Sequence, residues 1–217
     1  VGDGSIFSGS GGIVSGRWQD CYKGIYRANY LFENIDKIPD MDPAQKERIL
    51  GEAYFLRGVF YDLLVRTYGG VPLLLKNITA EEARQVSRAT AEEVWAQVHA
   101  DWDEAIKRLP KDAESNGHAT LGAALGMKMK AYLFNSQWDK VLEYCDKIDA
   151  LGKYKLFPSY YGLFQYENEG NDETLFAVSF MDGAFSQGSI FDRYWQPQNL
   201  KYGIDGSNSV APTQLLV

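Results

Sequence analysis

Apolar and aromatic residues recur at helical spacing through most of the first 150 residues, and this periodicity limits the possible folds more than any other feature. The first stripe of a repeat of about 3.6 residues consists of Trp18, Tyr22, Ile25, Asn29 and Phe32. It predicts a helix that ends before Pro39. Strand-like patterns appear only after residue 152, so the chain is expected to be mainly α-helical.

A second helix is predicted to start after Asp42. Asp42 suits the N-cap, Pro43 suits the first helical position, and Gln45 is placed to close a capping box. The apolar stripe that follows alternates steps of four and three, and it is read as Ile49, Ala53, Leu56, Phe60, Leu63 and Thr67. The glycine pair at 69–70 then stops the helix.

Three more helices follow from caps and breakers. Thr90-Ala91-Glu92-Glu93 is a capping box that starts a third helix, which Pro110 ends. The apolar stripe of this helix is Val94, Val98, Trp102, Ala105 and Leu109. A fourth helix is expected from about Thr120 to Phe134. Residues 135–137 allow only a tight reversal, so the helix from Trp138 to about Ala150 should pack antiparallel to the fourth.

These helices, in 18–67 and 90–150, suggest pairs of the tetratricopeptide kind, although self-similarity at a period of about 34 residues is weak. A single pair cannot bury its apolar face, so several pairs are expected to stack into a right-handed scaffold. The predicted fold class is mainly α, a tetratricopeptide-like helical-repeat scaffold with long loops.

The part after residue 151 has a different composition, rich in Gly, Ser, Asn and aromatic residues. Residues 175–180 form its one strand-like run, and the rest is expected to be long ordered loops. Large rings are costly to leave in water. We therefore expect four of these rings to pack on the helices or to face a ligand: Tyr160, Tyr161, Phe164 and Tyr166.

Length and composition favour one domain over residues 1–217, with a helical part at 18–150 and a loop-rich part at 151–217. A net charge of −7 with scattered Lys and Arg argues against nucleic-acid and anionic-lipid partners. No apolar run approaches the ~20 residues that span a bilayer, and Val1 begins no signal peptide. Membrane attachment would have to come from residues outside this sequence. Cys21 and Cys145 are expected to be buried thiols, with a mutual disulfide as the alternative.

Residues for catalysis are scarce. The sequence has two histidines, His99 and His118, both assigned structural roles, and no zinc-protease, paired-cysteine or nucleophile-elbow motif. The glycines near the N-terminus do not fit a phosphate-binding spacing and are expected to form a flexible loop. The acidic residues gather only at Glu167, Glu169, Asp172 and Glu173. This cluster is interpreted as a solvated loop, with a calcium loop as the alternative, and paired glycosidase carboxylates remain the enzyme hypothesis. No catalytic residue, metal ligand or cofactor is predicted.

Aromatic side chains are the remaining candidates for function. The apolar face of a sugar ring stacks on Trp or Tyr while amides and charged groups bind its hydroxyls. Residues 191–199 concentrate these types, with Trp195 as the stacking platform and loop packing as the alternative. The partners predicted for Trp195 are Arg193, Tyr194, Gln196 and Asn199. A second candidate is the N-terminal loop 3–17, which could bring Phe7, Arg17 and Asp20 to one rim.

The other tryptophans lie within helical patterns, and core packing is predicted for Trp18, Trp95, Trp102 and Trp138. The same prediction applies to the tyrosines of the first two helices.

Residues at fixed spacing also resemble a known family. The matches begin with Trp18, Tyr22, Ile25, Ala28-Asn29, Ile35 and Ile38-Pro39. They continue with Glu52-Ala53-Tyr54-Phe55-Leu56-Arg57, Tyr61, Leu64 and the exit Tyr68-Gly69-Gly70-Val71-Pro72-Leu73. This pattern resembles the SusD/RagB family of surface glycan-binding proteins. The resemblance continues through 117–120, Trp138, 157–164 and 173–176, and it fades over 182–209.

The resemblance implies a SusD-like helical scaffold and a lipoprotein on the outer membrane of a Gram-negative bacterium of the Bacteroides group. It implies capture of oligo- or polysaccharides without catalysis and delivery to a SusC-like TonB-dependent outer-membrane transporter, with the scaffold facing the transporter and the loops facing the sugar. Residues 211–217 resemble the inside of a family domain, so a partial chain, incomplete at both ends, is expected. Two alternatives remain: a helical-repeat scaffold that binds a peptide or protein partner, and a glycoside hydrolase. The identity of the glycan is left open, as is a peptide cargo.

Overall fold

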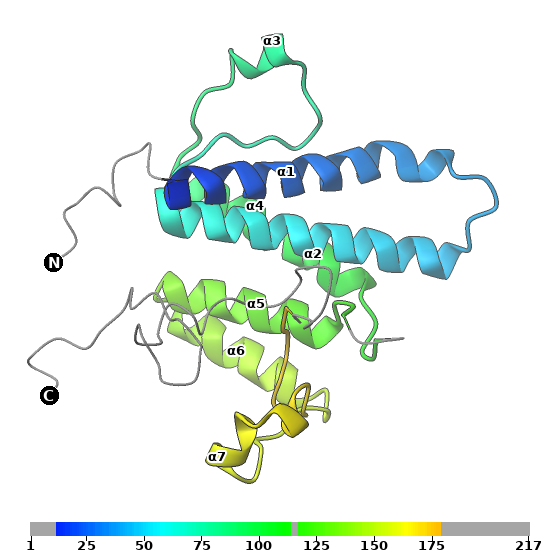
Figure 1. Cartoon of the computed structure of the whole chain (residues 1–217), viewed down its shortest axis with the longest axis vertical. Helices are drawn as coiled ribbons and strands as arrows, with labels where there is room; N and C mark the ends of the chain where they lie inside the picture. The colour runs from blue at the N-terminus through cyan, green and yellow to red at the C-terminus, as the bar shows by residue number, and fades with distance from the viewer. Residues whose placement is uncertain (1–11, 114–116, 179–217) are drawn as a thin grey trace, which may run out of the picture. The chain divides into compact units, whose positions relative to one another are not determined.

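The computed structural model describes residues 12–113 and 117–178 (Figure 1). Its helices, in chain order, are α1 Gly12–Asn34, η2 Ile35–Lys37, α2 Pro43–Tyr68, α3 Ala80–Ala83, α4 Ala91–Arg108, α5 Leu121–Phe134, α6 Trp138–Asp149, α7 Tyr160–Leu163 and η3 Tyr166–Asn168. The chain divides by its internal contacts into residues 1–177 and 178–217, and the description below concerns the first unit. The single domain expected for residues 1–217 stays a prediction.

The long helices pack as neighbours in a layered arrangement (Figure 1). α2 packs most extensively on α4 and next on α1, α5 pairs with α6, and α4 also packs on α5. The three-residue reversal before Trp138 makes α5 and α6 a helical hairpin, as its length predicted. The mainly α, helical-repeat fold class is confirmed.

Side-chain caps fix the helix starts that the sequence predicted. The Asp42 carboxylate accepts a bond from the backbone N–H of Gln45 at 2.8 Å, and Thr90 caps α4 in a full capping box with Glu93. Thr120 accepts from the Ala123 N–H at 3.2 Å at the start of α5. Each cap satisfies donors that the first turn of a helix leaves open. A further capping box, between Thr79 and Glu82, starts the short helix α3. Neither this box nor this helix was predicted from the sequence.

The first helix begins earlier than its predicted stripe. α1 starts at Gly12 rather than near Trp18, so Arg17 and Asp20 lie on the exposed side of a helix and not on the rim of a loop. The predicted loop 3–17 is therefore wrong over its described part, residues 12–17, whereas a surface rim that includes Arg17 and Asp20 stays a prediction. Phe7 lies outside the described residues.

The core lies between α2, α4 and α5. All five residues of the predicted α4 stripe are buried. Trp102 is the largest, with none of its surface exposed, and its indole Nε1 donates to the carbonyl oxygen of Phe55 at 3.2 Å. The close approach of this ring to α2 depends on Gly58, because a Cβ there would lie 2.5 Å from the indole nitrogen.

The buried face of α2 differs from the predicted stripe. Of that stripe only Ala53 is buried, and Leu56 is 44% exposed. The apolar side chains that α2 does bury are Phe55, Tyr61, Leu64 and Val65. The helix packs on α1 on one side and on α4 on another, so apolar residues surround much of it and the period alone does not select one face. The predicted stripe instead borders the groove between α1 and α2, where Phe60 lies against Gly24.

Three predicted core rings are exposed. Trp138 is 60% exposed, Tyr26 is 56% exposed and Tyr30 is 55% exposed. α1 packs chiefly on α2 and α6 chiefly on α5, so the outer face of each helix is uncovered in the described structure. Trp18 and Trp95 pack on the core as partly buried rings, as predicted.

The strand predicted over 175–180 is absent from its described part, residues 175–178. The Phe176 ring instead meets the Phe55 ring edge-on, with centroids 4.9 Å apart, and Leu175 packs against the cluster of Leu125 and Tyr144. An isolated extended segment needs a neighbouring strand for its backbone bonds, and the described part of the chain offers none. Burial against the helices therefore replaces pairing in a sheet.

The two cysteines are free thiols, so the alternative of a mutual disulfide is wrong. Cys21 is buried in the core, as predicted, and Cys145 is half-buried beside the sulfur of Met129 at 3.4 Å.

A buried polar network joins α1, α2 and α4. Arg57 binds both carboxylate oxygens of Asp101, at 2.6 and 2.9 Å, and donates to the amide oxygen of Asn29 at 2.8 Å. Asn29 in turn donates to the carbonyl oxygen of Leu74. Burial raises the pKa of Asp101, and the bidentate bond from Arg57 opposes that shift. The network fixes the order of three helices and ties the loop after α2 to α1.

The membrane search covers the described helices, and none of them combines the length and the apolar character needed to cross a bilayer.

Candidate functional site

The most exposed aromatic rings of the described structure lie on one segment, residues 155–173, which we call the aromatic loop. Its rings are Tyr160, Tyr161, Phe164 and Tyr166, which are 82%, 78%, 69% and 81% exposed. The sequence predicted that these rings pack on the helices or face a ligand. The packing alternative is wrong within the described structure, and the ligand alternative stays a prediction.

Local hydrogen bonds hold the backbone beneath these rings. Ser159 caps α7 by accepting from the Gly162 N–H at 3.0 Å, and Asn168 donates to the Gly162 carbonyl at 2.7 Å. Glu173 accepts from the backbone N–H of Phe157 at 2.8 Å and so ties one end of the loop to the other. The rings are thus exposed on a backbone with defined positions, which lowers the entropy cost of binding a ligand.

The rings differ in how much of each face they offer. Tyr160 and Phe164 meet edge to face, with centroids 5.3 Å apart and an interplanar angle of 76°. Tyr161 and Tyr166 have no ring partner among the described residues. The faces of Tyr161 and Tyr166 are therefore open to a flat apolar ligand surface.

A small hollow lies between the two ends of the aromatic loop. It has a volume of about 310 Å³ and is lined by Lys155, Leu156, Phe157, Pro158, Asn171 and Asp172. Lys155 Nζ and Asp172 Oδ2 form an exposed ion pair at 2.9 Å. This pair places a donor and an acceptor on the same loop as the rings, which suits a ligand with vicinal hydroxyls. Sequence reasoning had singled out these rings and Asp172 but had not connected them.

The five residues predicted to form the site, Arg193, Tyr194, Trp195, Gln196 and Asn199, lie outside the described residues. The prediction made for them is therefore untested.

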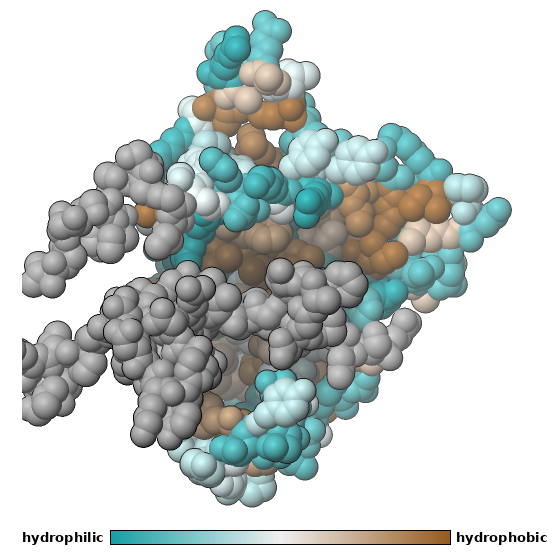
Figure 2. All heavy atoms as spheres, in the orientation of Figure 1, coloured by the Kyte–Doolittle hydropathy of each residue, from teal (hydrophilic) through white to brown (hydrophobic). Residues whose placement is uncertain are grey.

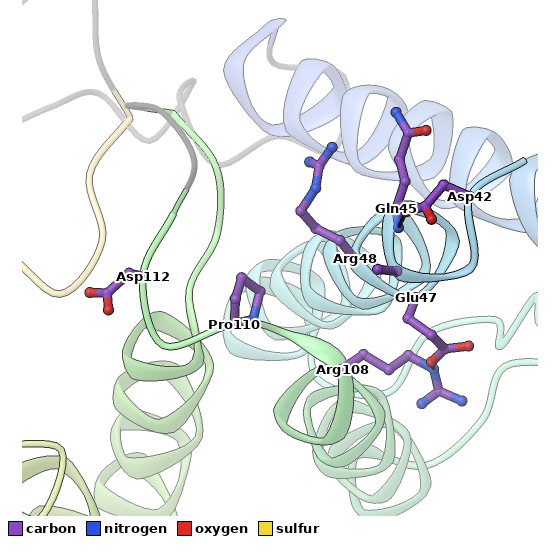
Figure 3. Close-up of a pocket in the computed structure, with 8 residues that line it drawn as sticks. Asp42, Gln45, Glu47, Arg48, Arg108, Pro110 and Asp112 are labelled. Carbon is purple, nitrogen blue, oxygen red and sulfur yellow. Dashed lines mark hydrogen bonds and ion pairs between the residues drawn. The ribbon is translucent and has the colours of Figure 1, made fainter.

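A larger hollow lies between the start of α2 and the end of α4 (Figure 3). It is lined by Asp42, Ala44, Gln45, Glu47, Arg48, Arg108, Pro110 and Asp112. Both of its arginines are paired: Arg108 lies beside Glu47 of the same hollow at 3.2 Å, and Arg48 pairs with Glu52, which does not line it, at 3.0 Å. No aromatic ring lines it, so it lacks a stacking surface and is interpreted as a surface ion-pair network.

A second aromatic surface runs along the outer side of α1. Its rings, four residues apart, are Trp18, Tyr22, Tyr26 and Tyr30. Tyr26 and Tyr30 lie roughly parallel, with ring centroids 6.4 Å apart at 28°. Tyr, Trp and Arg are enriched in protein interfaces, so this surface has the composition of one. The groove between α1 and α2 adds apolar area beside it, visible as a brown band in Figure 2.

Both histidines have structural environments. His118 Nδ1 lies 2.8 Å from Glu52 and 3.2 Å from Arg48, and the His99 ring stacks on Tyr132 at 4.3 Å. The acidic cluster is partly used by its own loop, through Glu173 and Asp172. Within 12–113 and 117–178, no three His, Cys, Asp or Glu side chains converge to hold a metal ion.

His99 makes stability depend on pH. Burial disfavours the charged imidazolium, nearby Lys128 adds to this effect, and together they lower the pKa of His99 to about 4. Between that value and its ordinary pKa of about 6.5, the unfolded chain binds a proton that the folded chain does not. The contribution of neutral His99 to the free energy of unfolding is therefore fully present above about pH 6.5. It is lost as the pH drops toward 4, by about 1–2 kcal/mol for a partly exposed group.

The measurement is urea unfolding at several pH values. In His99→Phe, which keeps a ring against Tyr132, the loss of stability on acidification should shrink by that amount. Equal acid loss in wild type and His99→Phe would contradict the assignment.

Comparison with known proteins identifies the family to which the chain belongs. A family model described as starch-binding and associating with the outer membrane, SusD-like, matches residues 12–133, more than half of the chain. The chain is similar to a SusD-like protein of Formosa agariphila, with 26% identity over 182 residues that cover 82% of this chain and 34% of the relative. It thus spans about a third of that relative's length.

Solved structures agree with the sequence relatives. The described fold resembles a SusD-like protein of Bacteroides fragilis, with 30% identity and a TM-score of 0.75 over 82% of this chain and 36% of that one. It also resembles a laminarin-binding SusD-like protein, with 27% identity and a TM-score of 0.70 over 77% of this chain and 41% of that one. These proteins carry SusD-like or binding names and no enzyme names. The chain belongs to the SusD-like family, whose model is described as starch-binding and associating with the outer membrane.

Proposed function

We propose that the protein binds oligo- or polysaccharides at the surface of a Gram-negative bacterium and does so without chemistry. The observation that carries the proposal is the aromatic loop, which exposes the rings of Tyr161 and Tyr166 and holds a hollow lined by Lys155 and Asp172 between its two ends. The relative named for laminarin binding supports the same class of ligand. Trp195 with Arg193, Tyr194, Gln196 and Asn199 is proposed as a further part of the binding surface.

The arrangement suits weak binding. Stacking contributes about 0.5–1.5 kcal/mol per ring, and exposed hydroxyl contacts compete with water. We therefore expect micromolar to millimolar dissociation constants for one short sugar, with tighter apparent binding to long polymers that engage several copies or several rings. No cofactor is needed for such binding.

We further propose that the protein is a lipoprotein and passes its glycan to a SusC-like TonB-dependent transporter. The exposed face of α1, with Tyr26, Tyr30 and Arg27, has the composition of a protein interface and supports a docking role. Copurification of the full-length protein from its own outer membrane tests this. Loss of the transporter from the complex in Tyr26→Ala/Tyr30→Ala would support docking through α1, whereas an unchanged complex would place the docking surface elsewhere.

Two other functions have less support from the described residues. A scaffold for a peptide or protein partner is favoured by the same face of α1, but it gives no role to the aromatic loop. A glycoside hydrolase would need two carboxylates that face each other across a sugar-binding cleft. Asp172 and Glu173 are bound within their own loop, and Glu167 and Glu169 are exposed side chains that line none of the hollows described above. Release of product from a labelled oligosaccharide would support the glycoside hydrolase function. Pull-down of a protein partner that soluble glycan does not displace would support the scaffold function.

Replacing the two open rings tests the binding site. Tyr161→Ala/Tyr166→Ala should weaken glycan binding by about tenfold or more, because two stacking contacts are lost. Stability should change by less than about 0.5 kcal/mol, since both rings are exposed. The measurement is affinity electrophoresis through gels that contain a panel of polysaccharides.

Two further variants complete this experiment. Tyr26→Ala/Tyr30→Ala also removes two exposed tyrosines, but from α1, and should bind glycan as wild type does. Trp195→Ala shows whether the segment 191–199 shares the site. Retardation that survives in Tyr161→Ala/Tyr166→Ala and disappears in Trp195→Ala would move the site to that segment. A wild type that no polymer retards would contradict glycan binding itself.

A further inference from the structure

The charge around the aromatic loop is predominantly negative. Four carboxylates lie in its second half, on Glu167, Glu169, Asp172 and Glu173. Glu167 and Glu169 are exposed: Glu167 follows Tyr166 directly on η3, and Glu169, the C-cap of η3, donates its backbone N–H to the Tyr166 carbonyl at 3.2 Å. Any ligand that stacks on Tyr166 therefore approaches these two carboxylates.

The positive charges nearby are already paired. Lys155 binds Asp172 at 2.9 Å, and Lys153 binds Asp112 at 2.8 Å. Among the described residues, Glu167 and Glu169 have no ion-pair partner. The ring surface thus faces an uncompensated negative charge, on a chain whose net charge is −7.

We infer that the aromatic loop selects neutral glycans and rejects carboxylated or sulfated ones, with Glu167 and Glu169 as the specificity-determining residues. The inference rests on the proposed glycan binding and adds the chemical class of the ligand. A sugar carboxylate stacked on Tyr166 would be repelled by both glutamates, whereas the Lys155–Asp172 pair can bind neutral hydroxyls as donor and acceptor. Unpaired like charges are a means by which a site disfavours the wrong ligand.

The expected effect is moderate and depends on salt. By Coulomb's law in water, a carboxylate within a Debye length of about 10 Å of a ligand charge weakens binding by about two- to threefold, hence two carboxylates by up to about tenfold together at low ionic strength. Screening shortens the range of the repulsion to about 3 Å at 1 M salt, so the discrimination should nearly vanish there.

The experiment compares matched polymers in titration calorimetry of the whole chain. The probes are laminarin, amylopectin and xyloglucan, each as the neutral polymer, as its carboxymethyl ether and as its hydroxyethyl ether. The hydroxyethyl form carries a substituent of similar size without charge, so it separates repulsion from steric hindrance. We expect the carboxymethyl form to bind up to about tenfold more weakly than the hydroxyethyl form at low salt, and the gap to close at about 1 M salt.

Two double variants assign the effect to residues. Glu167→Gln/Glu169→Gln should close the gap at low salt and leave binding of the neutral polymer unchanged. Glu81→Gln/Glu92→Gln removes the same two charges from exposed sites on α3 and α4 and should keep the gap. Equal binding of the two ethers by wild type would overturn the inference, as would a gap that survives Glu167→Gln/Glu169→Gln. Failure of every neutral polymer to bind would instead contradict the proposed function, and the inference with it.

Discussion

Asp101→Ala is expected to lower the free energy of unfolding by about 3–5 kcal/mol, the usual result of removing one partner from a buried ion pair. Asp101 is 1% exposed and Arg57 is 6% exposed, and the two share two hydrogen bonds. Without the carboxylate, the guanidinium keeps the hydrogen bond to the Asn29 amide and its contact with the Phe32 ring, and no opposite charge in the described structure faces it. Urea unfolding followed by circular dichroism measures the change.

Asp146→Ala is the matched control for Asp101→Ala. Asp146 is an exposed aspartate on α6, so its removal should change stability by less than about 0.5 kcal/mol. Similar losses in the two variants would show that the Arg57 network does not hold the helices together. The double variant Arg57→Met/Asp101→Leu should recover part of the loss, since apolar groups of similar size leave no charge buried.

Trp102→Ala should cost about 3–5 kcal/mol, whereas Trp138→Ala should cost less than about 1 kcal/mol. Both tryptophans lie on helices and both were predicted to be core residues. Trp102 lies on α4 and is completely buried against α2. Its loss opens a cavity that the surrounding helices cannot fill. Trp138 is 60% exposed, so water already contacts most of its ring.

The pair of tryptophan variants is its own control, because both remove the same side chain from a helix. Thermal unfolding of each variant against wild type measures the difference. A large loss in Trp138→Ala would mean that residues outside the described structure cover the α6 face.

Local signals explain why the helices were predictable. The caps at Asp42, Thr90 and Thr120 and the breaker at Pro110 act within a few residues of one another, so the sequence shows them directly. The α4 stripe was predictable for a related reason: this helix has a narrow apolar face, and all of that face is buried. The family pattern had a different basis, because it matched residues at fixed spacing and the comparison confirmed it.

Other features depended on neighbours that the sequence does not specify. α2 packs on several sides, so its period pointed to the face beside α1 and missed the face that carries Phe55 and Tyr61. The charged partners Arg57 and Asp101 are 44 positions apart, and no local pattern connects them. The exposure of Tyr161 and Tyr166 was equally hidden, because a ring in a loop packs inward or faces outward according to contacts made elsewhere.

The sequence by itself determined the helical class, most helix boundaries and the family, since caps, breakers and periodicity are encoded by near neighbours along the chain. The tertiary structure alone decided which faces are buried, which charges meet and which rings remain bare. Burial is a property of contacts between distant segments, and two tryptophans with the same local pattern, Trp102 and Trp138, therefore end in the core and in water.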